Sequence, residues 1–130
     1  MYSIAVAGAR IAYERTGQGP AALLIQGVGV AGSGWRPQVS GLSKHYTLIT
    51  FDNRGIGSSS APAGPYSTGQ MAADAKALVD HLGIRDFHLM GVSMGGMIAQ
   101  EYALAYPDDL RSAAFACTYA APGPFCIPRF

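Results

Sequence analysis

Charged side chains are scarce in this sequence. They make up 13% of its 130 residues, whereas about 25% is typical of a soluble domain. So few charges indicate that much of the chain is made to be covered by other polypeptide. The formal net charge of +1 creates no basic field. Nucleic acid and anionic membrane surfaces are therefore not expected as partners.

Long apolar runs are absent as well. No stretch approaches the roughly 18 apolar residues of a membrane span, and residues 1–8 lack the basic and apolar segments of a secretory signal. We therefore expect no membrane association and a cytoplasmic location. Cysteine is rare too, with Cys117 and Cys126 the two present. In a cytoplasmic chain such a pair is more often free than joined in a disulfide.

The sequence does contain an alternation of apolar runs and helical patterns, over a length that suits one domain at residues 1–130. Strands are predicted for residues 3–6, 9–14, 21–25, 46–51, 87–90 and 110–118, and helices for 37–44, 68–82 and from 94 to about 106. This alternation is typical of an α/β fold with a mostly parallel sheet of about six strands and helices on both faces. Ligands of such sheets bind at the carboxyl ends of the strands.

The clearest motif is Gly91-Val92-Ser93-Met94-Gly95, which lies between the strand from Phe87 and the helix that follows. Glycine at positions 91 and 95 lets strand and helix approach closely, and the tight turn strains the backbone at Ser93. Such a turn lifts the serine hydroxyl clear of the sheet, close to the unpaired N–H groups of the new helix. The motif therefore predicts Ser93 as a nucleophile.

A second glycine-rich turn, Gly27-x-Gly29-x-x-Gly32, allows two interpretations. Asp52 lies twenty residues beyond Gly32, which is the spacing of a dinucleotide-binding fingerprint. In that fold the third glycine packs in the opening turn of the helix. Here Pro37 follows five residues later, and a residue before proline is biased away from helical geometry. The predicted helix therefore starts too late for a dinucleotide site, which remains the lesser alternative.

The same turn suits an oxyanion hole. A serine that attacks an acyl carbonyl needs N–H donors where the tetrahedral oxyanion forms. We expect one donor from Met94, the residue after the nucleophile, and the other from Val28, with Gly27 and Gly29 letting the backbone approach the substrate. No lysine follows the turn at residues 91–96, so that turn is not a nucleotide-triphosphate loop.

Three motifs together resemble the amino-terminal half of an α/β-hydrolase. They are Gln26-Gly27-Val28-Gly29, similar to the oxyanion-loop His-Gly motif; Asp52-Asn53-Arg54-Gly55-Ile56-Gly57-Ser58-Ser59, similar to the Asp-x-Arg-Gly-x-Gly-x-Ser turn; and Gly91 to Gly96, similar to the nucleophile elbow. The resemblance extends to about Thr118 and is strongest to small esterases, enol-lactonases and cofactor-free haloperoxidase-type enzymes. It implies a serine hydrolase that acts on small-molecule carboxylic esters without a cofactor.

The remaining site residues are assigned from their place in these motifs. Gln26 stands where histidine is common in the family, and with Gly27 and Gly29 it is expected to contact substrate. Trp35 either walls the substrate pocket or packs its loop. Asp52 is expected to organise its turn together with Arg54. Met94 and Met97, at helical spacing, are interpreted as core side chains.

No histidine follows Ser93, although the family order is serine, then acid, then histidine. The three histidines, His45, His81 and His88, are all predicted at the amino edge of the sheet, and His88 lies about 16 Å below Ser93 at strand rise. The later carboxylates Glu101, Asp108 and Asp109 are also poorly placed. We therefore predict a truncated hydrolase that lacks the cap, the later strands, and the acid and histidine loops. Its activity is then weak, or needs another chain.

Without those later strands, the predicted strand at residues 110–118 would expose one flank, which is a template for pairing. We therefore expect a homo-oligomer formed through this strand. The main alternative to an enzyme is a non-catalytic, oligomerising relic of the same fold.

Overall fold

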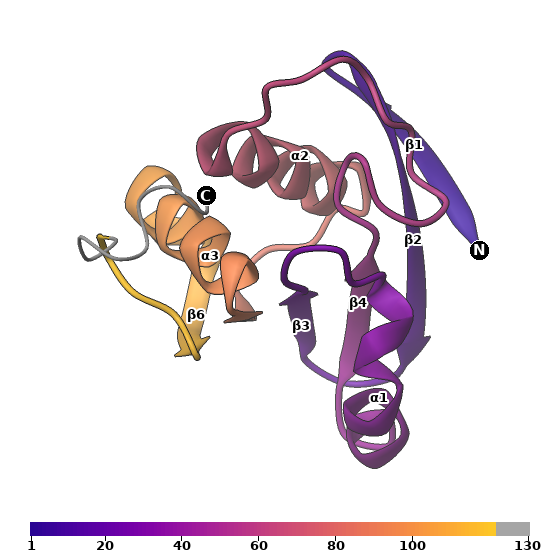
Figure 1. Ribbon diagram of the computed structural model, residues 1–130. Coiled ribbons are helices and arrows are strands. Elements are labelled where there is room, and N and C mark those ends of the chain that lie inside the picture. Colours follow the sequence, from indigo (N-terminus) through magenta and orange to yellow (C-terminus); the bar gives the residue numbers. More distant parts are fainter. Residues whose placement is uncertain (122–130) are drawn as a thin grey trace.

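The computed structural model of the chain describes residues 1–121 and contains one six-stranded sheet in the order β1-β2-β4-β3-β5-β6 (Figure 1). The strands are β1 (Tyr2–Val6), β2 (Ala9–Gly17), β3 (Ala21–Ile25), β4 (Thr47–Phe51), β5 (Phe87–Val92) and β6 (Leu110–Ala116), and the α-helices are α1 (Arg36–Leu42), α2 (Thr68–His81) and α3 (Met94–Ala105). Short 3₁₀ helices, η1 (Gly32–Trp35) and η2 (Pro107–Asp109), precede α1 and β6. Cys126 lies outside the described residues, and Cys117 is an exposed free thiol.

The sheet is mostly parallel, as predicted. Strands β4, β3, β5 and β6 run parallel, while β1 and β2 add an antiparallel ribbon at one edge. Every residue of β4 is buried, as expected for a strand with helices over both faces. The chain enters β4, β3 and β5 from the same end, so the loops that follow these strands meet at one edge of the sheet.

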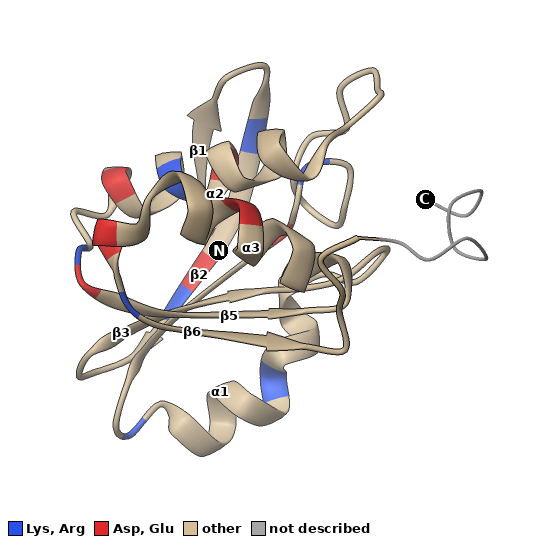
Figure 2. Cartoon of the chain, turned by 90° about the vertical axis from the view of Figure 1, so that its left-hand side faces the viewer, with Lys and Arg blue, Asp and Glu red and all other residues tan. Residues whose placement is uncertain are grey.

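Helices cover both faces of the sheet, which also confirms the prediction. Figure 2 shows α2 and α3 on one side of the sheet and α1 on the other. The larger core lies under α2 and α3, where Leu78, Phe87 and Tyr102 are fully buried. The smaller core lies on the α1 side, around Leu24, Trp35 and Leu48. Within residues 1–121, no helix has the length and apolar character needed to cross a membrane.

Some predicted boundaries are wrong. Strand β2 continues to Gly17, where a loop was expected, because it pairs with β4 as far as Thr47. Arg36 is helical at φ −51° and ψ −43° although it precedes Pro37, because its N–H continues the 3₁₀ turn by donating to the Ser33 carbonyl. Helix α1 nevertheless begins four residues after Gly32, which agrees with the prediction that it starts too late for a dinucleotide-binding turn. Strand β6 ends at Ala116, two residues before the predicted Thr118.

A polar cluster joins α2, α3 and η2. The Lys76 ammonium and the Tyr102 hydroxyl each donate to Asp109 over 2.7 Å. Burial alone would raise the pKa of Asp109, but these two hydrogen bonds hold it below its usual value. The hydrogen bond to Asp109 raises the pKa of Lys76 in turn. The cluster therefore stabilises the packing of both helices against the start of β6.

Replacing Lys76 by methionine is expected to lower the free energy of unfolding by about 1–2 kcal/mol at pH 7, since hydrogen bonds to charged groups are stronger than neutral ones. Because the pKa of Asp109 is lowered in the folded state, its contribution is fully present above the pKa of an unfolded aspartate, which is about 4, and is lost as pH falls through the lower folded pKa. Because the pKa of Lys76 is raised, its contribution is complete below about pH 10 and is lost above.

Urea unfolding of the wild type and of Lys76→Met between pH 3 and 10 measures this difference, which should shrink at the acid end. Lys44 is exposed and has no ion pair among the described residues, so Lys44→Met is the matched control and should change stability little at any pH. An equal loss for both variants would contradict the assignment.

Candidate active site

Ser93 sits at the apex of the turn between β5 and α3, as the motif predicted. Its φ of 56° and ψ of −122° lie in a region that non-glycine residues rarely adopt. Its N–H donates to the Ala116 carbonyl over 2.9 Å, and its own carbonyl accepts from Gly96 and Met97. The side chain is exposed and makes no hydrogen bond to residues 1–121. The turn thus holds the backbone rigidly and presents the hydroxyl.

The two glycines of the turn are required by close backbone contacts. A Cβ on Gly91 would overlap the Gly95 carbonyl, and one on Gly95 would overlap the carbonyls of Ile25 and Gln26. The first turn of α3 therefore packs directly on the end of β3. This contact brings the loop after β3 beside the serine.

The loop after β3 lies against Ser93. A Cβ built on Gly27 would be 3.2 Å from the Ser93 Cβ and 3.6 Å from its Oγ. Gln26 is buried, and its Oε1 accepts from the Gly27 N–H over 3.2 Å. Its carbonyl accepts from the Asn53 side chain, also over 3.2 Å. Asn53, which sequence analysis did not single out, thus ties the loop after β4 to the loop beside the serine.

The amides of Val28 and Met94 have no hydrogen-bond acceptor among the described residues. Met94 opens α3, so its N–H is one of the groups that a helix leaves unpaired. Val28 is 60% exposed, and the following Gly29 adopts φ +71°. Both predicted donors are therefore available, on the two loops that meet at Ser93.

A cavity of about 320 Å³ adjoins this turn. It lies between the loop after β3, the loop after β4 and the starts of α2 and α3. Its apolar lining includes Val28, Ile56, Tyr66, Met71, Met94 and Met97. Met94 and Met97 are half-buried and face this cavity, and Met94 also packs against the larger core, so their interpretation as core side chains is incomplete.

Trp35 does not reach the cavity beside Ser93. It is 4% exposed and packs with Leu24 and Leu48 on the α1 face of the sheet. Of the two roles left open for it, the structure favours packing. Its sequence position before α1 could not separate the two roles, because the direction of that loop depends on the layers around it.

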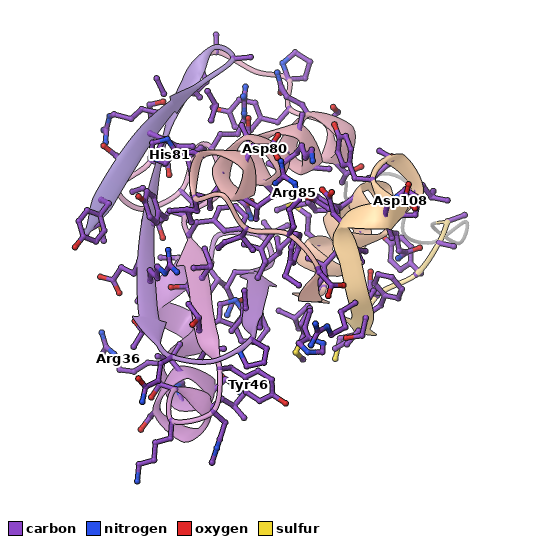
Figure 3. All side chains as sticks on the ribbon, turned by 180° about the vertical axis from the view of Figure 1, so that it is seen from behind. Arg36, Tyr46, Asp80, His81, Arg85 and Asp108 are labelled. Atoms are coloured by element: carbon purple, nitrogen blue, oxygen red, sulfur yellow. The ribbon has the colours of Figure 1, made fainter. Side chains whose placement is uncertain are left out.

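No histidine approaches Ser93. His45 precedes β4, and His81 ends α2, where Figure 3 shows it with Asp80 and Arg85. His88 lies in the body of β5, where its Nδ1 is 2.6 Å from the Ser112 Oγ and its ring packs edge-on against Tyr46. Within residues 1–121, all three histidines therefore lie away from Ser93, and residues 122–130 contain no histidine.

The later carboxylates do not supply an acid at this site either. Asp109 is engaged by Lys76 and Tyr102 at the amino end of β6, and Glu101 is exposed on α3. Nowhere in residues 1–121 do three or more His, Cys, Asp or Glu side chains gather so that they could hold a metal ion.

Asp52 organises its turn, but not with Arg54. One of its carboxylate oxygens accepts from the Gly32 N–H over 2.7 Å and the other accepts from the Ser58 N–H over 2.8 Å. The twenty-residue spacing from Gly32 therefore marks a hydrogen bond within the protein. Asp52 is 6% exposed, and both of its carboxylate oxygens already accept from backbone amides, so the spacing is explained without a bound ribose.

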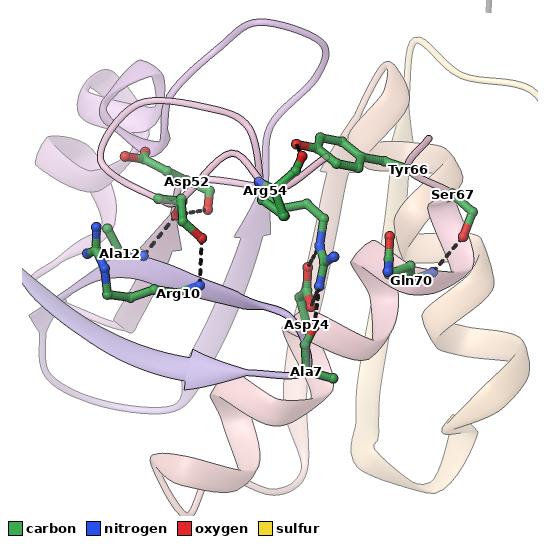
Figure 4. A network of polar contacts seen from close by, with 12 residues as sticks. Ala7, Arg10, Ala12, Asp52, Arg54, Tyr66, Ser67, Gln70 and Asp74 are labelled. Atoms are coloured by element: carbon green, nitrogen blue, oxygen red, sulfur yellow. Dashed lines mark hydrogen bonds and ion pairs between the residues drawn. The ribbon is translucent and has the colours of Figure 1, made fainter. Parts of the chain in front are cut away.

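Arg54 pairs instead with Asp74 of α2, as Figure 4 shows. Two hydrogen bonds of 2.7 Å join the guanidinium to the carboxylate, and a third reaches the Ala7 carbonyl. The bonds to Asp74 raise the pKa of Arg54 against the lowering effect of burial. Sequence analysis missed Asp74, although an acidic residue between Met71 and Leu78 on the apolar face of a helix was a usable signal.

Comparison with known proteins agrees with this geometry. The sequence pattern of the alpha/beta hydrolase fold matches residues 20–128. RutD of Azorhizobium caulinodans, named as a candidate carbamate hydrolase, is 39% identical over 100 residues, covering 77% of this chain and 38% of RutD. The 3-oxoadipate enol-lactonase 2 of Acinetobacter baylyi is 36% identical over 104 residues, covering 80% of this chain and 39% of that enzyme.

The solved enol-lactonase from Burkholderia xenovorans superimposes with a TM-score of 0.91 at 34% identity, covering 98% of this chain and 52% of the enzyme. The chain thus spans about two fifths of the length of these curated relatives and about half of the solved structure. With its parallel sheet, its strained serine turn and these matches, the chain belongs to the α/β-hydrolase family.

Proposed function

We propose that the chain carries the nucleophile and the oxyanion hole of a serine hydrolase that acts on carboxylic esters. The observation that carries this proposal is the exposed Ser93 hydroxyl on a strained turn, beside the unpaired amides of Met94 and Val28. Hydrolytic names among the relatives support the reaction class.

In the proposed reaction, the Ser93 Oγ attacks the acyl carbonyl and loses its proton to a base. The carbonyl oxygen becomes an oxyanion that accepts hydrogen bonds from the Met94 and Val28 amides. Its collapse breaks the ester C–O bond, and the leaving oxygen takes the proton back from the base and departs as the alcohol. Water then gives a proton to the base and attacks the acyl group on Ser93, which releases the carboxylic acid and returns a proton to the Ser93 Oγ. No metal or organic cofactor is needed for these steps.

We propose that the general base is supplied from outside residues 1–130, by a longer chain or by another chain, because none of the three histidines reaches Ser93. Without a base, acyl transfer loses most of its rate, although oxyanion stabilisation and binding can leave roughly 10³–10⁴-fold over water. We therefore expect weak activity from this chain alone, and a large increase when polypeptide bearing the acid and the histidine is supplied.

Slow, specific labelling by a fluorophosphonate probe is the expected result for the isolated chain. Intact-mass measurement and peptide mapping should locate one adduct on Ser93, and Ser93→Ala should remove it. Ser112 is also exposed but lies on β6 with no oxyanion hole, so Ser112→Ala should label like the wild type. Labelling that survives Ser93→Ala would refute the proposal, and no labelling at all would favour a non-catalytic relic of the fold.

A homo-oligomer formed through β6 is the second part of the proposal. Strand β6 ends the sheet, and residues 111–115 within it are exposed, including Phe115 at 46%. A second copy could extend the sheet across this edge. A cytoplasmic location stays a prediction.

Phe115→Lys is expected to shift the chain from oligomer to monomer in sedimentation equilibrium at micromolar concentration, because a charge on an edge strand opposes strand pairing. Leu104→Lys is the matched control, since Leu104 is 82% exposed but lies on α3 and forms no part of the sheet. A wild-type chain that is already monomeric would contradict the proposed homo-oligomer.

A further inference from the structure

The cavity beside Ser93, which we call the methionine pocket, is lined by very few charged side chains. Among the described residues that line it, Arg54 alone is charged. Its side chain is 3% exposed and is held by Asp74 and by the Ala7 carbonyl. The charge that could attract an anionic substrate is therefore already neutralised within the protein. Figure 2 likewise shows few charged residues at the end of the sheet towards which β5 and β6 point.

The remaining lining is mostly apolar and adaptable. Met71, Met94 and Met97 come from two different helices and converge on the pocket. Unbranched thioether side chains adjust to irregular apolar ligands at little cost.

Three hydroxyl residues also line the pocket: Tyr66, Ser67 and Thr68. Tyr66 donates to the Pro62 carbonyl, and Ser67 accepts from the Gln70 N–H. A hydroxyl group is neutral, so none of the three can balance the charge of a ligand carboxylate.

The size of the pocket limits its occupant. At about 320 Å³ the cavity is at the lower end of the roughly 300–1,000 Å³ that ligand pockets span, so it suits a small group. Its wall includes Val28 and Met94, whose amides are the proposed oxyanion donors. A group that fills the pocket is therefore attached close to the reacting carbonyl.

We propose that the methionine pocket binds the acyl group of the substrate, and that this acyl group is small, uncharged and apolar. This proposal rests on the proposed ester hydrolysis, but the preference of the pocket for an uncharged ligand can be measured by binding alone. Among residues 1–121, no free cation lines the pocket, so a carboxylate that entered it would lose water without gaining an ionic partner, which is unfavourable. The chain should therefore discriminate against esters of dicarboxylic acids.

Methionine-methyl NMR tests this directly, because the chain has five methionines and three line the pocket. The probes are octanamide and 6-amino-6-oxohexanoate, which have the same number of non-hydrogen atoms and share the amide head group. The second carries a carboxylate at the far end of the chain, where it would enter the pocket. Octanamide should shift the ¹³C-methyl signals of Met71, Met94 and Met97. Met90, which packs against the smaller core on the other side of the sheet, should not respond. The carboxylate probe should bind about tenfold more weakly or worse, which corresponds to roughly 1.4 kcal/mol.

Two variants distinguish ligand binding in the pocket from the reaction at Ser93. Ser93→Ala should bind octanamide as the wild type does, so loss of labelling and loss of binding can be told apart. Met97→Lys should reverse the preference towards 6-amino-6-oxohexanoate, with the other methyl signals reporting that the fold is kept. Equal binding of both probes, shifts confined to Met90, or no shift with either probe up to the solubility limit would each overturn the proposal.

Discussion

Gly95→Ala is expected to lower the free energy of unfolding by about 3 kcal/mol or to prevent folding. The added Cβ would overlap the backbone carbonyls of Ile25 and Gln26, and a backbone cannot rotate away as a side chain can. Overpacking typically costs about 1–3 kcal/mol, and more where the neighbours are rigid. Against a total stability of roughly 5–15 kcal/mol, that is a large loss.

Gly69→Ala is the control for Gly95→Ala. Gly69 lies in α2, where an added Cβ would meet its nearest atom only at 4.0 Å. Alanine should therefore stabilise the helix by about 0.5–1 kcal/mol. Urea unfolding followed by circular dichroism measures both variants. If Gly95→Ala unfolded at the same urea concentration as the wild type, the close contact between α3 and β3 would be refuted.

Asp74→Leu is expected to destabilise the protein by about 3–5 kcal/mol, because it leaves the Arg54 guanidinium buried and unpaired. The side chains of Arg54 and Asp74 are 3% and 4% exposed, so water cannot replace the lost partner. The double variant Arg54→Met with Asp74→Leu should recover most of this loss, since an apolar pair of similar volume removes both charges.

A double-mutant cycle in urea measures the coupling between Arg54 and Asp74. The exposed pair of Arg111 with Asp86, at 51% and 63% exposure, is the comparison, and Arg111→Met should change stability by no more than about 1 kcal/mol. If Asp74→Leu were as mild as Arg111→Met, the ion pair could not be a buried one. The double variant should also leave the methionine pocket selective for octanamide, because it adds no charge there.

The order of strands and helices was predictable because its signals are local. Apolar runs mark β3 and β4, Ser67 caps α2 by accepting the Gln70 N–H, and Gly83 follows its end with φ +67°. Each of these signals depends on neighbouring residues. The predicted boundaries were wrong at two places. Pairing with β4 extends β2 to Gly17, and the 3₁₀ turn at residues 32–35 continues into α1 at Arg36.

The candidate site was predictable only in part, for the same reason. Ser93 and its glycines are contiguous, so their geometry follows from the motif. The methionine pocket combines segments near residues 28, 55, 66 and 97, and no local pattern indicates that Met97 faces it. Histidines could be excluded from strand direction alone, since a residue at the amino edge of a parallel sheet cannot reach a serine at the other edge.

The sequence by itself therefore determined the family, the α/β layering, the strained serine and the absence of a histidine beside it, because each is encoded in residues close together or in their order. Tertiary structure alone decided that Asp52 binds Gly32, that Arg54 is neutralised by Asp74 and that Trp35 packs away from the site. These contacts join residues far apart in the chain. Which residues meet in these contacts depends on how α1, α2 and the loops pack on the sheet. That packing involves the sheet and the helices on both of its faces together, so no single segment of the sequence encodes it.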